Sequence, residues 1–200
     1  MLKIKFFLVF LSIFILLGCG KNSNISLADI ISNFKSSQIS ETNLISKAGA
    51  PLFDGLGFHS HKISSNVYGV QRYFDQGMIM AFAFNHAESI RSFKAAQKLD
   101  PSCAMCFWGE ALALGPNINV NSDGKVIMAS QNRIAAFKAI NTAITLSKSV
   151  SKKEQDYIFA LATRYNGDPD TSREPLDIAY ANAMENLSKN YPKDNDAASL

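Results

Sequence analysis

After residue 70, apolar residues recur at helical spacing along most of the chain, and polar or glycine–proline turns separate these stretches. An apolar residue at every third or fourth position gives a helix one face to bury, so the pattern predicts packed helices. Capping boxes are expected at Asn85–Glu88 and Ser151–Glu154, where a new helix begins. The expected helices are two between Tyr73 and Pro101, then Cys103–Leu114, Met128–Leu146, one after Ser151, and Leu176–Lys189.

The first helix pair has a more specific spacing of small and large residues. Gly77 and Ser89 allow two helices to approach closely, and Phe93 fills the space around them. With Ala96 and Pro101, these positions match the tetratricopeptide pattern. The sequence therefore predicts an all-α fold, a short right-handed solenoid of about three tetratricopeptide-like helix-turn-helix repeats over residues 70–200, the second with an inserted loop.

Several strings in this region resemble a family of bacterial tetratricopeptide-repeat proteins, which are largely uncharacterised and longer than this chain. The strings are Tyr73–Gly77, Phe84–Glu88, Arg91–Phe93, Leu99–Met105, Trp108–Gly109 and Leu114–Asn117, and the resemblance runs from about Leu56 to the end. Because the chain stops soon after Pro192, before another helix could close the stack, we expect further sequence beyond its C-terminus.

The resemblance also implies a concave surface that binds peptide segments and is lined by the first helix of each pair. The residues expected in this groove are Phe74, Met78, Phe82, Met105 and Trp108. The alternative is that the same residues pack against neighbouring helices, because an aromatic stripe at helical spacing is often part of a core. The expected partner is a protein or peptide held by apolar contacts.

The first 18 residues predict a lipoprotein signal peptide. Two lysines precede an apolar stretch from Phe6 to Leu17, which is too short to span a bilayer. The string ending at Cys19 resembles a lipobox, which implies that Cys19 is acylated and attaches the chain to a lipid bilayer; the alternative is an ordinary signal peptide. Gly20 favours the outer membrane, with the protein facing the periplasm. Residues 19–47 are expected to form a flexible tether and residues 48–69 an extended lead-in.

Charge and motif content restrict the function further. The chain has 20 Lys and Arg residues against 17 Asp and Glu residues, with no basic run. A protein that binds nucleic acid by neutralising phosphates needs a basic face, so no nucleic-acid partner is expected. The nucleophile elbow, the zinc-protease helix and the phosphate loop are all missing from the sequence. We therefore predict no catalytic residue and no enzyme activity.

Cysteine and histidine supply the candidate chemistry. Cys103 and Cys106 are spaced to share one side of a helical turn, and in an oxidising compartment they can form a disulfide; the alternative is that both pack in the core. His59, His61 and His86 could join this pair around a transition metal, which would make the chain a periplasmic metal-binding or thiol redox protein. No cofactor is expected otherwise.

Residues 119–124 imitate the start of a calcium loop. An EF-hand needs a bidentate Glu at its twelfth position, where this chain has Ser130. Asx turns explain these residues better than a calcium site.

Overall fold

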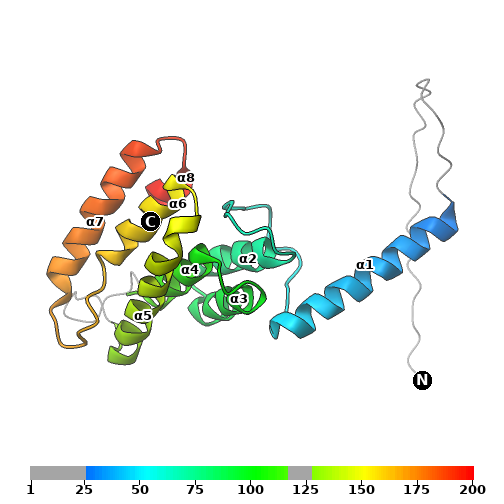
Figure 1. The fold of residues 1–200 in the computed structure, drawn as a ribbon, viewed down its shortest axis with the longest axis horizontal. Helices are drawn as coiled ribbons and strands as arrows, with labels where there is room; N and C mark the ends of the chain where they lie inside the picture. Colours follow the sequence, from blue (N-terminus) through cyan, green and yellow to red (C-terminus); the bar gives the residue numbers. More distant parts are fainter. Residues whose placement is uncertain (1–25, 117–127) are drawn as a thin grey trace. The chain divides into compact units, whose positions relative to one another are not determined.

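The computed structural model describes residues 26–116 and 128–200, and in these residues every regular element is a helix (Figure 1). Contacts divide the chain after Gln38, and the compact unit Ile39–Leu200 contains the helices from α2 onward. The helices are α1 (Leu27–Ala48), α2 (Val70–Phe82), α3 (His86–Leu99), α4 (Ala104–Leu114), α5 (Ser130–Leu146), a short 3-10 helix η1 (Ser147–Ser149), α6 (Lys152–Ala162), α7 (Arg173–Asn190) and α8 (Asn195–Ser199). The all-α prediction is confirmed for this part of the chain.

Helices pair in chain order within the compact unit. α2 packs against α3, α4 against α5, and α6 against α7 (Figure 1). The pairs join through α3 on α4 and α5 on α6, and the first helices also meet, α2 with α4 and α4 with α6. The helices α2, α4 and α6 therefore contribute to one common face, called the inner face below.

Phe93 explains why the first two pairs pack so closely. A Cβ added at Gly77 would lie 2.7 Å from the ring of Phe93, and one added at Gly109 would lie 2.3 Å from it. The hydroxyl of Ser89 donates to the Gly77 carbonyl at 2.7 Å. The prediction that Gly77 and Ser89 allow close helix approach is confirmed, and Gly109 does the same on α4.

Local signals fix the helix ends. Ser151 and Glu154 form the complete capping box that was predicted before α6. The box at Asn85 forms only in part: the Asn85 side chain accepts from the Glu88 backbone, but the Glu88 carboxylate pairs with Arg91 at 3.4 Å instead of turning back. Cys103 was expected inside α4 and is its N-cap instead, because its Sγ accepts from the Cys106 backbone at 3.2 Å.

The segment expected to be a flexible tether differs from the prediction, because α1 covers most of it. Within the compact unit, Leu44 and Ala48 of this helix are buried, and Leu44 contacts the position where Gly69 lacks a Cβ. Burial of one apolar face can stabilise a helix that has a polar, Ser-rich composition. Of the expected lead-in, residues 48–69, only Ala48 belongs to a helix, the end of α1, and residues 49–69 have no helix or strand. In the part of the chain described here, no helix has the length and apolar character needed to cross a membrane.

Candidate functional site

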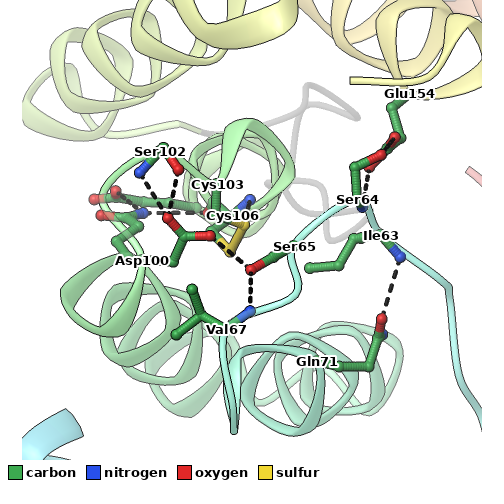
Figure 2. The surroundings of a disulfide bond; sticks show 12 residues. Ile63, Ser64, Ser65, Val67, Gln71, Asp100, Ser102, Cys103, Cys106 and Glu154 are labelled. Atoms are coloured by element: carbon green, nitrogen blue, oxygen red, sulfur yellow. Dashed lines mark hydrogen bonds between the residues drawn. A yellow bond between two sulfur atoms is a disulfide. The ribbon is translucent and has the colours of Figure 1, made fainter. Parts of the chain in front are cut away.

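The lead-in lies on the inner face, held through its backbone by side chains of α2 and α6. The amide of His61 donates to Asp75 at 3.1 Å, and the amide of Ile63 donates to Gln71 at 3.2 Å. The amide of Ser64 donates to Glu154 at 2.7 Å (Figure 2). The inner face therefore holds residues 61–64 by their backbone, in the way that a receptor holds an extended peptide.

Upstream residues of the lead-in are held by α2 in the same manner. The Tyr73 hydroxyl donates to the Ala50 carbonyl at 2.5 Å. The side-chain amide of Gln76, which is 4% exposed, donates to the Pro51 carbonyl at 3.0 Å and accepts from the Phe53 amide at 2.9 Å. Contacts of this type depend little on which side chains the bound segment carries.

Side-chain contacts centre on His61, which is only 5% exposed. Its ring stacks over Trp108, with centroids 6.5 Å apart and planes 18° apart, and meets the edge of Tyr157 at 5.0 Å. The indole Nε1 of Trp108 donates to the Tyr157 carbonyl at 3.1 Å, which fixes the ring that His61 covers. His61 is thus an anchor that packs against a contacting pair of aromatic side chains, Trp108 of α4 and Tyr157 of α6.

Two carboxylates near the C-terminus complete the surroundings of His61. Nδ1 of His61 lies 2.7 Å from Oδ2 of Asp196, and Nε2 of His59 lies 3.5 Å from Oδ1 of the same carboxylate. Oδ2 of Asp194 accepts from the Tyr157 hydroxyl at 2.7 Å and pairs with Lys153 at 2.5 Å. The site therefore joins the lead-in to residues more than 130 positions later in the chain.

Burial and hydrogen bonding together set the pKa values of Asp194 and Tyr157. Burial alone raises the pKa of Asp194, but the hydrogen bonds from Lys153 and Tyr157 outweigh it and hold the pKa below its ordinary value. Burial raises the pKa of Tyr157 far above its usual range, and the hydrogen bond to Asp194 and the negative charge of that carboxylate raise it further. Tyr157 therefore remains a protonated donor to Asp194 at any physiological pH.

A second polar site surrounds the disulfide that joins Cys103 to Cys106, whose Cα atoms are 5.3 Å apart (Figure 2). A cavity of about 200 Å³ separates Cys103 from Glu154 and the lead-in. Asp100 borders it and accepts from Ser65 and Ser102, both at 2.6 Å. Burial raises the pKa of Asp100, but these hydrogen bonds outweigh it and hold the pKa below its ordinary value.

The predicted groove residues lie mostly in the core. Phe74, Met78, Met105 and Trp108 are at most 1% exposed, while Phe82 is 38% exposed. The expectation that the first four are open to a partner is therefore corrected. Phe74 and Trp108 do lie on the inner face, but the ring of His61 is 6.0 Å from Phe74 and stacks on Trp108, so the chain's own lead-in covers them.

The five candidate metal ligands do not form one site. Cys103 and Cys106 bind each other, and both are buried. His86 begins α3 beside Phe84; burial lowers its pKa, and neither ring nitrogen has a hydrogen-bond partner among the described residues. Only His59 and His61 share a partner, the carboxylate of Asp196.

Asp194 and Asp196 were missed by sequence reasoning. The available signal was the Asp-x-Asp spacing that begins two residues after Pro192. The same spacing also indicates the start of a helix, and Asp194 does cap α8. Cys19 and the calcium-like residues 119–124 lie outside the residues that the structure describes.

In comparisons with protein-family models, curated proteins and solved structures, nothing matched this chain.

Proposed function

We propose that this chain is a lipid-anchored, tetratricopeptide-like protein of the bacterial cell envelope whose inner face binds extended peptide segments as a scaffold or adaptor. The observation that supports this best is the way α2 and α6 hold the lead-in. Asp75, Gln71 and Glu154 each accept a backbone amide of residues 61–64. A face that binds one extended segment through its backbone is suited to binding another.

The proposed location rests on the sequence and on one structural feature. The lipobox-like string at Cys19 supports acylation and attachment to the outer membrane, with the repeats in the periplasm. A disulfide between Cys103 and Cys106 suits an oxidising compartment of this kind. Because both cysteines are buried, we favour a structural disulfide over a thiol redox centre.

In this proposal the lead-in is a tethered competitor for the partner. A segment joined to its receptor by a short linker reaches an effective concentration in the millimolar range. A partner peptide that makes the same contacts must therefore compete with the lead-in, and it binds measurably only when the lead-in is weakened. This requirement defines the test.

The test changes the lead-in and leaves the inner face intact. In the variant His61→Ala with Ser64→Pro, the lead-in loses its aromatic anchor and the amide that donates to Glu154. The probe is a fluorescein-labelled peptide of residues 58–66, with binding followed by fluorescence anisotropy on the full chain in nonionic detergent. We expect micromolar binding to this variant and at least tenfold weaker binding to the unaltered protein.

The matched control is Phe58→Ala, since Phe58 is a fully exposed residue of the same segment. It should bind the probe as weakly as the unaltered chain does. A peptide with the same residues in reversed order controls for composition. If the folded double variant binds the two peptides equally, or binds neither, the inner face is not a peptide-binding surface.

A further inference from the structure

We propose that His61, Asp194 and Asp196, joined by His59, form a binding site for a divalent transition-metal ion, with Zn²⁺ the best fit. One ligand atom from each of the first three residues lies within 4.8 Å of the others. An ion with bonds of about 2.0–2.2 Å brings its ligand atoms to about 3–4 Å from one another. Side-chain adjustments of about an ångström would therefore close the site around an ion.

The donor atoms determine the class of metal. Two imidazole nitrogens and the carboxylate oxygens are ligands that zinc and neighbouring transition metals accept readily. Calcium and magnesium instead prefer oxygen ligands alone. The pairing of His59 and His61 around Asp196 therefore favours a transition metal over Ca²⁺ or Mg²⁺.

The local charge also favours a dication. The two carboxylates lie close together, with side chains only 10–11% exposed. Asp194 pairs with Lys153, whereas Asp196 contacts the imidazoles of His59 and His61. The geometry thus places two carboxylates and an imidazole around one point, as a dication requires.

The surroundings could support a bound metal. The Tyr157 hydroxyl already orients the Asp194 carboxylate, as outer groups commonly do for metal ligands. Lys153 competes with an ion for this carboxylate, and its side chain is 43% exposed, so it can swing into solvent when an ion binds. Trp108 and Tyr157 contact each other, with ring centroids 5.6 Å apart, and both pack against the His61 ring, which limits its rotation.

Such a site would cross-link two distant parts of the chain. His59 and His61 belong to the lead-in, while Asp194 and Asp196 follow α7. An ion bound by all four would fasten the lead-in on the inner face. This inference does not depend on peptide binding, since a metal could hold the lead-in whether or not any peptide replaces it.

Co²⁺ is the probe, because its visible absorption reports its coordination geometry. The full chain is purified in nonionic detergent without a polyhistidine tag, and Co²⁺ is added, followed by Zn²⁺ as a competitor. We expect one Co²⁺ per chain, a spectrum typical of low-coordinate nitrogen–oxygen ligation, and displacement by one equivalent of Zn²⁺. Binding no tighter than that of Co²⁺ to detergent buffer would overturn the proposal.

Variants assign the ligands. Asp196→Asn and His61→Ala should each weaken Co²⁺ affinity at least tenfold. His59→Ala removes a side chain that is 35% exposed, so this variant should fold, and it should change the Co²⁺ spectrum and weaken binding severalfold. The matched control His86→Ala removes an imidazole outside the site and should leave the Co²⁺ affinity and the Co²⁺ spectrum unchanged. Equal losses in His86→Ala and His61→Ala, or no change in His59→Ala, would refute the assignment.

A second readout does not rely on the metal spectrum. Lys62 is an exposed trypsin site between the two lead-in serines Ser60 and Ser64. Bound Zn²⁺ should slow cleavage after Lys62 at least tenfold in the unaltered chain and should have no effect in Asp196→Asn. If the metal binds but the peptide assay fails, only the scaffold function is refuted; the reverse result refutes only the metal site.

Discussion

Substituting Gly109 with Ala tests whether close packing at Phe93 holds the first two helix pairs together. The new Cβ would lie 2.3, 2.4 and 2.6 Å from three atoms of the Phe93 ring. Carbon atoms pack at about 3.5 Å or more, so the ring must move by about 1.2 Å. Since the same ring edge also approaches Gly77, it has little room on the side of α2.

The expected net effect combines two opposing contributions. Overpacking of this kind costs about 1–3 kcal/mol, and the close distance at Gly109 suggests the upper end. Ala is favoured over Gly inside a helix by about 1 kcal/mol. Gly109→Ala should therefore lower the free energy of unfolding by about 2 kcal/mol. Gly77→Ala should lower it by about 1 kcal/mol, because its nearest ring atom lies at 2.7 Å.

Urea unfolding of the purified chain, followed by far-UV circular dichroism, measures these free energies. Phe93→Leu provides a second background in which the smaller side chain leaves space for the new methyl group. In that background Gly109→Ala should cost at least about 1 kcal/mol less than in the unaltered chain. The reasoning would be refuted if Gly109→Ala is neutral or stabilising, or if its cost is the same in both backgrounds.

Three further predictions concern the surroundings of the inner face. Asp100→Asn should destabilise the protein at neutral pH and progressively less below about pH 4. A carboxylate whose pKa is depressed in the folded state stabilises that state fully above its unfolded pKa and loses this contribution as the pH falls through the folded pKa. Thermal unfolding of the unaltered protein and the variant from pH 7 to pH 3 checks this. The Cys103–Cys106 disulfide closes only a short loop, since the two residues are three positions apart. Reducing it with dithiothreitol should therefore lower the free energy of unfolding by only about 2 kcal/mol. A loss above about 4 kcal/mol would contradict the loop-entropy argument. Trp108→Phe keeps an aromatic ring but leaves the Tyr157 carbonyl without its indole donor. It should lower the free energy of unfolding, measured in urea, by about 1–3 kcal/mol. An unchanged urea midpoint would mean that the hydrogen bond contributes nothing.

The sequence by itself determined the six helices from α2 to α7 and their pairing. Capping groups, glycine–proline turns and apolar stripes act over a few residues, so their effect can be seen in the order of the residues. Ser151 and Glu154 predicted the start of α6 correctly, and Gly77 with Ser89 predicted the close packing of α2 and α3. At α1 the local composition was misleading, because burial of Leu44 and Ala48 against other parts of the compact unit supports a helix in a Ser-rich stretch.

Only the tertiary structure decided what covers the inner face. The apolar stripes that contain Phe74 on α2 and Trp108 on α4 show that each helix has a face to bury, but they do not show whether solvent, a partner or the chain itself lies there. His61 meets Asp196 across 135 positions of sequence, a distance over which no periodic pattern extends. The candidate site therefore arises from long-range packing of the lead-in and the C-terminal residues, whereas the helices that carry it arise from local interactions.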